Sequence, residues 1–161
     1  MKTLYLIRHA KSSWAFDLND HDRPLGKRGR KDVFKMGKHL LENQPPPEIL
    51  ISSTASRAFY TALHICDQMG IDEGHIRLEK NLYHAGSSEI LSVIKEAPNC
   101  ERLALFGHNP GFTSAANSLA NLNFDNVPTC GMVGINFNVR YWKDVEFGKG
   151  MLTFFYFPKE I

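Results

Sequence analysis

Short apolar runs alternate with stretches of helical periodicity along most of this chain. Residues 4–7, 49–51 and 103–106 are continuous apolar runs, which are typical of strands buried on both faces of a parallel sheet, and residues 76–78 form a weaker run. Helical patterns separate the runs, over residues 27–41, 87–95 and 112–122 and over a stretch that ends near residue 69. This alternation predicts an α/β fold with a mostly parallel central sheet.

Local signals set the ends of the predicted helices. The first helix is predicted from apolar residues at helical spacing, namely Val33, Phe34, Met36, Leu40 and Leu41. Prolines at 45–47 end that pattern. The second helix has Ser52, Ser53 and Thr54 as N-cap candidates and Gly70 as its stop signal.

The last thirty residues have a different pattern. Residues 133–139 alternate between apolar and polar side chains, and residues 152–157 follow a turn near Gly148 and Gly150, so we expect a closing antiparallel hairpin. The predicted architecture is a three-layer α/β/α sandwich. A chain of 161 residues fits one domain, which we expect to span residues 1–161.

Composition and charge exclude several classes of protein. Hydrophobic residues make up 43% and charged residues 22%, which suits a globular core, and the net charge of +2 gives no broad field to attract nucleic acid or a membrane. No apolar run approaches the ~18 residues of a membrane span. Three widely spaced cysteines without a CxxC pair argue against a disulfide framework. We therefore expect a cytoplasmic protein.

Polar residues follow three of the predicted strands directly. They are Arg8 and His9 after the first, residues 52–57 with Arg57 after the second, and His108 with Asn109 after the strand at 103–106. Ligands of open α/β sheets bind outside the carboxyl ends of the strands, so these side chains should meet at one edge. Two histidines and two arginines there predict an anion site, and the helix behind Pro110 adds amides that favour anions.

This set of residues suits phosphoryl transfer. A histidine nucleophile needs one unprotonated ring nitrogen and an acceptor for its other N–H. Arg8 and Arg57 would keep His9, with a reference pKa of about 6.5, neutral in the empty site, and would neutralise phosphoryl oxygens during transfer. His108 would add a further donor. Zinc held by His9 and His108 is the rival, although zinc would need carboxylate or thiolate ligands and the arginines would repel it.

The motifs resemble those of the histidine phosphatase superfamily, whose fold is that of phosphoglycerate mutase. The resemblance covers residues 4 to about 120 and is carried by residues 6–10 (LIRHA), 23–26 (RPLG), 52–62 (SSTASRAFYTA) and 107–111 (GHNPG). It implies that His9 becomes phosphohistidine, that Arg8, Arg57 and His108 hold the phosphoryl group, with Asn109 beside them, and that no metal or other cofactor is needed. The short segment from 78 to 103 is similar to the small SixA-type phosphohistidine phosphatases and implies an open cleft.

The proton donor for the leaving group departs from the pattern of the wider family. Many members supply an acid from the stretch that matches residues 82–86, where this chain offers only His84. Asp20 in the long polar loop 11–25 and Glu89 in the next helix are the alternatives. An enzyme without a strong acid should prefer a good leaving group, such as the imidazole of phosphohistidine.

We therefore predict a phosphohydrolase acting on phosphohistidine, in a protein partner, or on another labile phosphorylated substrate. Two alternatives stay open. One is a small-molecule phosphomonoesterase, and the other is a non-catalytic module that binds phosphate or a phosphoprotein without turnover.

Overall fold

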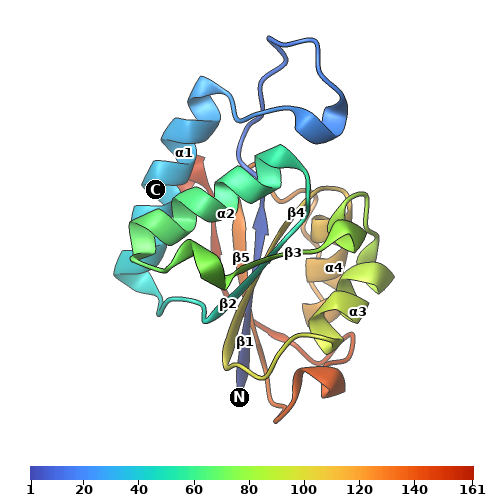
Figure 1. Cartoon of the computed structure of the whole chain (residues 1–161). Helices are drawn as coiled ribbons and strands as arrows, with labels where there is room; N and C mark the ends of the chain where they lie inside the picture. The colour runs from blue at the N-terminus through green and yellow to red at the C-terminus, as the bar shows by residue number, and fades with distance from the viewer.

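The apolar runs form the strands of one six-stranded sheet. The computed structural model describes all residues from 1 to 161, and the strand order is β3-β2-β4-β1-β5-β6 (Figure 1). The strands are β1 Lys2–Arg8, β2 Ile49–Ser52, β3 Ile76–Leu78, β4 Arg102–Gly107, β5 Met132–Phe137 and β6 Met151–Tyr156. β3, β2, β4 and β1 run parallel, so their carboxyl ends lie at one edge of the sheet.

Four helices cover the two faces of this sheet. They are α1 Lys27–Asn43, α2 Ser56–Met69, α3 Ser87–Lys95 and α4 Gly111–Ala120. Figure 1 shows α1 and α2 on one side of the strands and α3 and α4 on the other. The predicted α/β/α sandwich is confirmed, with helix bounds within about three residues of those expected.

The sequence of β1 is apolar without alternation because both faces of this strand are buried. Leu4 and Leu6 enter the core beneath α3 and α4, whereas Tyr5 and Ile7 enter the core beneath α1 and α2. Successive side chains of a strand point to opposite faces, so a strand between two helical layers must be apolar at every position.

The C-terminal strands close one edge in the antiparallel sense that the sequence predicts. β5 pairs antiparallel with β1 and with β6, and the β5–β6 register shifts between Gly134 and Ile135. Gly134 is required there, because an added Cβ would meet the Phe154 ring at 2.3 Å. The expected hairpin is therefore confirmed, with a bulge that the sequence did not indicate.

Two local predictions are wrong. α2 begins at Ser56 with Ala55 at its N-cap, and no side chain caps it, so Ser52, Ser53 and Thr54 are not caps. Phe34 and Leu41, predicted to face the core, are exposed, because the buried stripe of α1 consists of Val33, Met36 and Leu40. Apolar residues that neighbour a helical stripe need not belong to it.

Loop 11–25 leaves the end of β1 and is closed at its base by backbone pairs. Ser12 bridges Leu25, and the Ser13 amide donates to the Pro24 carbonyl at 2.8 Å. The Gly26 amide donates to the Lys11 carbonyl at 2.9 Å. Gly29 lets α1 approach this base, because a Cβ there would meet the Lys11 carbonyl oxygen at 2.1 Å. The tip of the loop contains a short 3-10 turn, Asp20–Asp22, with no buried residue.

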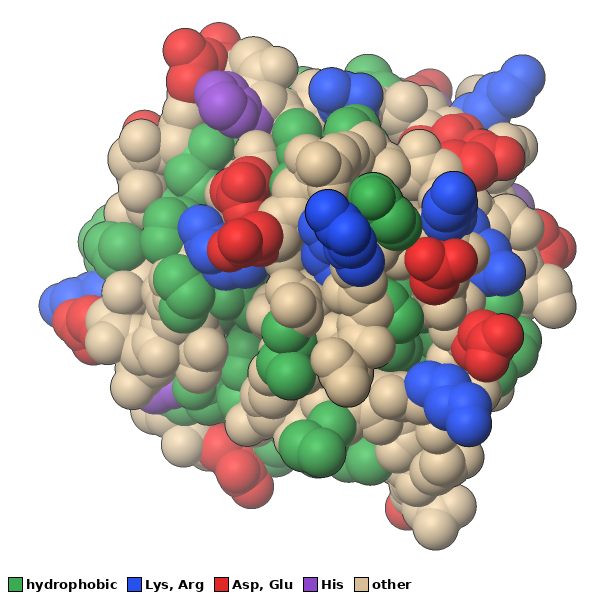
Figure 2. Space-filling view, turned by 90° about the horizontal axis from the view of Figure 1, so that it is seen from below, with side chains coloured by type: hydrophobic (Ala, Val, Ile, Leu, Met, Phe, Trp, Pro, Cys, Tyr) green, Lys and Arg blue, Asp and Glu red, His purple; other side chains and the backbone are tan.

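The surface shows no large patch of one charge on the face seen in Figure 2, which lies at the amino ends of the parallel strands. Lysine and arginine side chains are interspersed there with aspartate and glutamate. No helix of the structure is both long enough and apolar enough to cross a membrane.

Candidate active site

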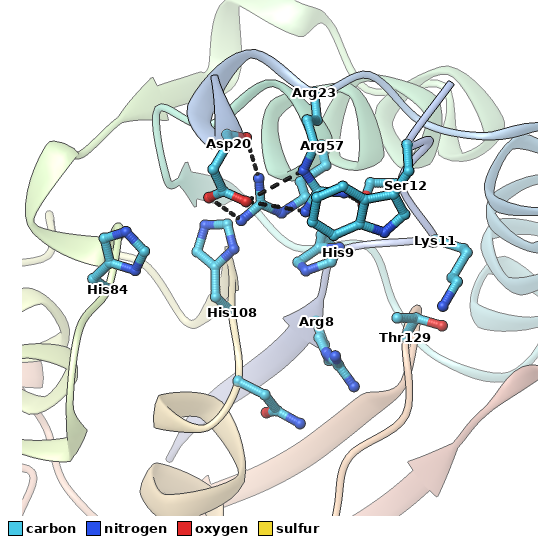
Figure 3. Close-up of a pocket in the computed structure, with 12 residues that line it drawn as sticks. Arg8, His9, Lys11, Ser12, Asp20, Arg23, Arg57, His84, His108 and Thr129 are labelled. Atoms are coloured by element: carbon cyan, nitrogen blue, oxygen red, sulfur yellow. Dashed lines mark hydrogen bonds and ion pairs between the residues drawn. The ribbon is translucent and has the colours of Figure 1, made fainter. Parts of the chain in front are cut away.

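One cavity of about 340 Å³ opens at the carboxyl ends of β1, β2 and β4 (Figure 3). Its lining is almost entirely polar, with Trp14 as the one hydrophobic side chain. Of the sequence-predicted site residues, the cavity brings together Arg8, His9, Asp20, Arg57, His84, His108 and Asn109. Lys11, Ser12, Arg23 and Thr129 complete the lining.

Adjacent strands place the two histidines side by side. β1 and β4 pair in register, with Arg8 opposite Gly107, so His9 and His108 each follow the same rung of the sheet. The His9 amide donates to the Gly107 carbonyl at 3.0 Å. The two ring centroids lie 5.2 Å apart, so one phosphoryl group can contact both rings.

His9 has the orientation that a nucleophile requires. Its Nδ1 lies 2.7 Å from the Ala10 carbonyl oxygen, which can only accept, so Nδ1 carries the proton and Nε2 has a free lone pair. Thr61 holds the adjoining backbone, because its Oγ1 accepts from the Ala10 amide at 3.0 Å.

The surroundings of His9 keep its ring neutral. The pKa of His9 falls from 6.5 to about 4, chiefly because of burial; the hydrogen bond to Ala10 opposes this shift, and the charges of Arg57, Arg8 and Arg23 contribute to it. The sequence predicted this direction from the arginines, but desolvation is the larger cause.

His108 is fixed by a residue that the sequence assigned to another role. Its Nε2 lies 2.8 Å from Ser53 Oγ, which also accepts from the Ala55 amide. The pKa of His108 falls to about 3, chiefly because of burial; His9, Arg57 and His84 contribute to this shift and Asp20 opposes it. His108 is therefore a neutral ring when the cavity holds no anion.

Three buried nitrogens of the chain have no hydrogen-bond partner, and all belong to this cavity. They are Arg8 Nε, Arg57 Nε and His108 Nδ1. Unpaired buried donors are rare because each costs about 1–3 kcal/mol. Arg8 is partly satisfied through its Nη1, which donates to the Val127 carbonyl at 2.9 Å.

Asp20 is bound by cations rather than free to hold a proton. Its Oδ1 accepts from Arg23 Nε and Nη2 at 3.2 and 3.1 Å, and its Oδ2 accepts from Arg57 Nη2 at 3.0 Å and from Tyr83 Oη at 2.6 Å. The bond from Tyr83, followed by those from the arginines, holds the pKa of this carboxyl well below its usual range. Asp20 is therefore ionised at neutral pH.

The other predicted acids and donors have different surroundings. His84 is exposed at the cavity rim, where its ring lies 3.9 Å from the Tyr83 ring, and Figure 3 shows His108 between His84 and His9. Glu89 is exposed on α3 and does not line the cavity.

Asn109 lines the cavity, but its side-chain amide forms hydrogen bonds within the protein. Its Nδ2 donates to Asn126 Oδ1 and the Val127 carbonyl, and its Oδ1 accepts from the amide and hydroxyl of Thr113. The bond to Thr113 also satisfies an amide in the first turn of α4, so this helix offers fewer free amides to an anion than its sequence suggested.

Four contributing residues were not assigned to the site from the sequence: Ser53, Thr61, Tyr83 and Arg23. Ser53, Thr61 and Arg23 do lie in the quoted motifs, which is the signal that could have identified them. Tyr83 only neighbours His84, and nothing in its sequence context points to Asp20, 63 residues away.

No three His, Cys, Asp or Glu side chains of the chain gather as a metal-binding group. The pair His9 and His108 has arginines as neighbours instead of further metal ligands. These residues do not fit a resident zinc ion, because the arginine charges oppose a cation.

An α/β sheet with two histidines and two arginines at its carboxyl edge defines a phosphoryl-binding class of protein. A model of the histidine phosphatase superfamily, branch 1, matches residues 4–89. The chain belongs to this superfamily, as the sequence motifs indicated.

The relatives agree with this assignment. An uncharacterised protein of Mycobacterium tuberculosis is 31% identical over 164 residues, covering 95% of this chain and 100% of the relative. SixA of Agrobacterium tumefaciens, a structure with a TM-score of 0.80 and 25% identity, covers 98% of both chains. A protein histidine phosphatase SixA complexed with tungstate has a TM-score of 0.78 at 16% identity, also over 98% of both chains, and supports the fold.

Proposed function

We propose that this protein is a metal-independent phosphohydrolase that forms a phosphohistidine on His9 and acts on phosphohistidine or a similar phosphoramidate. The observation that carries this proposal is the hydrogen bond from His9 Nδ1 to the Ala10 carbonyl. It leaves Nε2 unprotonated in a cavity whose arginines and second histidine suit the oxygens of a phosphoryl group.

The reaction proceeds in two displacements. His9 Nε2 attacks phosphorus, the bond from phosphorus to the leaving nitrogen breaks, and the electron pair departs with the leaving group. Water then attacks the phosphorus of phospho-His9, the P–Nε2 bond breaks, and the His9 lone pair is restored as phosphate leaves. Arg8, Arg57 and His108 stabilise the charge on the phosphoryl oxygens in both steps.

The protonation of the leaving group favours a phosphoramidate. Asp20 is ionised and has both oxygens committed, and Glu89 lies outside the cavity, which leaves exposed His84 and water as proton sources. An alkoxide leaves poorly without a strong acid, whereas an imidazole can leave with its distal nitrogen already protonated.

The relatives support this choice of substrate. SixA of Agrobacterium tumefaciens is described as a proposed phosphohistidine phosphatase, and the SixA that was solved with tungstate, a tetrahedral oxyanion with the shape of phosphate, as a protein histidine phosphatase. The cavity is open to solvent beside exposed Trp14, so a phosphorylated side chain of a protein partner can reach His9.

The test is to trap the covalent intermediate. The protein is mixed with radiolabelled phosphoramidate, quenched in alkali and analysed for acid-labile, alkali-stable label by peptide mapping. We expect label on His9 in the wild type, none in His9→Ala, and undiminished label in His64→Ala, which alters a histidine of α2 outside the cavity. Hydrolysis of phosphohistidine peptides, an aryl phosphate and an alkyl phosphate is then compared, with and without a chelator.

Alkyl phosphate turnover equal to that of phosphohistidine would contradict the substrate class. Chelator sensitivity would contradict the metal-independent mechanism. Tight phosphate binding without label or turnover would instead identify a non-catalytic binding module.

A further inference from the structure

The Arg57 guanidinium is held by Asp20 of loop 11–25. Arg57 Nη1 donates to the backbone carbonyl of Asp20 at 2.7 Å, and Arg57 Nη2 donates to Asp20 Oδ2 at 3.0 Å. A guanidinium is a rigid planar fork, so two bonds to one residue fix both its plane and its direction. The Arg57 side chain is only 7% exposed and has no other side-chain hydrogen bond.

Asp20 is itself held from two sides. Arg23 binds Oδ1 from within the same loop, and Tyr83 donates its hydroxyl to Oδ2 at 2.6 Å. Tyr83 follows the short 3-10 turn Lys80–Leu82 and precedes His84, which lines the cavity. The Asp20 side chain is 43% exposed at a loop tip without buried residues, so packing does not fix it. The bond from Tyr83 is the only hydrogen bond that joins the Asp20 side chain to this segment.

On the basis of the phosphoryl-transfer function above, we propose that Tyr83 and Asp20 are positioning residues that orient Arg57 for the phosphoryl group. Asp20 does not serve as the acid in this arrangement. Both of its oxygens accept hydrogen bonds from N–H or O–H donors, and neither has a proton to give to a leaving group. The chain Tyr83, Asp20, Arg57 links three elements that come together only in the folded protein.

The test is a double-mutant cycle measured on two substrates. Asp20→Ala, Tyr83→Phe and the double variant are assayed with an aryl phosphate and with an alkyl phosphate, whose leaving groups differ in their need for a proton. We expect Asp20→Ala to lower kcat/KM about 10²-fold, by the same factor for both substrates, because a misplaced group affects both alike. Tyr83→Phe should lower it about fivefold, and should have no further effect in the Asp20→Ala background.

Matched variants control for the loss of a carboxylate or a hydroxyl. Asp17→Ala removes an exposed carboxylate from the same loop, and Tyr60→Phe removes an exposed hydroxyl from α2. Neither residue lines the cavity, and both variants should retain wild-type kcat/KM. Unchanged thermal midpoints across the set would show that the losses are not losses of folding.

Three outcomes would overturn the proposal. A loss in Asp20→Ala that is confined to the alkyl phosphate would identify Asp20 as the acid. Additive effects in the double variant would show that Tyr83 does not act through Asp20. Wild-type activity of Tyr83→Phe would show that Tyr83 has no role in positioning Arg57. Calorimetric binding of inorganic phosphate provides a readout that does not need turnover. If the wild type hydrolyses nothing, the proposed function fails, yet weaker phosphate binding in both single variants would still support the orientation of Arg57.

Discussion

The two halves of the cavity differ sharply in how firmly the protein holds them. His9, Arg57 and His108 come from the ends of strands or the start of a helix and are 8%, 6% and 7% exposed. Trp14 and Phe16 on loop 11–25 are 76% and 61% exposed. Side chains on a packed sheet are placed by the core, whereas those on the loop tip depend on a few polar bonds. We infer that the strand half performs the chemistry, that Asp20 of the loop orients Arg57 for it, and that the exposed rings of the loop lie where a substrate approaches.

The strongest test of this difference is His108→Ala on the buried side. Removing one donor to a phosphoryl group should lower kcat by about 10²- to 10³-fold. The measurement is steady-state hydrolysis of an aryl phosphate, with His64→Ala as the control outside the cavity. A loss below tenfold would mean that His108 is a neighbour of the site rather than part of it.

The buried side should also make stability depend on pH. The pKa values of His9 and His108 fall to about 4 and about 3 in the folded protein, so the unfolded chain binds more protons as pH falls through 6.5. Stability should therefore be full above pH 6.5 and decrease toward pH 4 by a few kcal/mol. Urea unfolding at pH 7 and pH 4.5 measures this, and His108→Gln should flatten the dependence. An unchanged pH dependence of the unfolding free energy in His108→Gln would contradict the lowered pKa of His108.

On the rim, His84→Gln should have a smaller and more selective effect. If His84 passes a proton to poor leaving groups, kcat for an alkyl phosphate should fall about tenfold, less than the roughly 10²–10⁴-fold typical of general acid catalysis because this ring is exposed, and kcat for an aryl phosphate should stay constant. The ratio of the two rates is the quantity to measure. Equal losses on both substrates would assign His84 to binding instead.

The smallest effect is expected at Phe16, an exposed ring of loop 11–25. Phe16→Ser removes an exposed ring that does not line the cavity, so hydrolysis of an aryl phosphate should change less than about twofold and the free energy of unfolding by less than about 0.5 kcal/mol. Phe34→Ser on α1 is the control for losing an exposed phenyl ring. A raised KM for a phosphoprotein alone would show that the tip contacts protein substrates.

The sequence alone was sufficient to identify the residues in the strand half of the site. Strands buried on both faces leave an unmistakable apolar run, and the residues that follow such runs in a parallel sheet must meet at one edge. His9 and His108 could be found by this rule because they directly follow β1 and β4, and Arg57 because it lies at the start of the helix that follows β2.

The remaining contacts depend on tertiary structure that no local pattern records. Ser53 was interpreted as a helix cap because it precedes a helix, yet its hydroxyl meets His108, 55 residues away. Asn109 was assigned to the substrate because it follows His108, yet its amide is used by Asn126, Val127 and Thr113. The sequence alone makes Asp20 a candidate acid, whereas in the structure its carboxylate accepts hydrogen bonds from Arg23, Arg57 and Tyr83. The chemistry of these residues follows from their partners, not from their neighbours in the sequence.

The closed base of loop 11–25 separates the nucleophile from changes in the length of the loop. The pairs Ser12–Leu25 and Lys11–Gly26 close the loop like the neck of an Ω-loop, and His9 lies on the sheet side of that neck. Insertions between residues 14 and 19 can therefore change the shape and length of the tip without passing strain to the nucleophile. The neck separates His9 from changes at residues 14–19, whereas Asp20 must keep its place against Arg57, so substrate preference can evolve in the part of the loop that precedes Asp20.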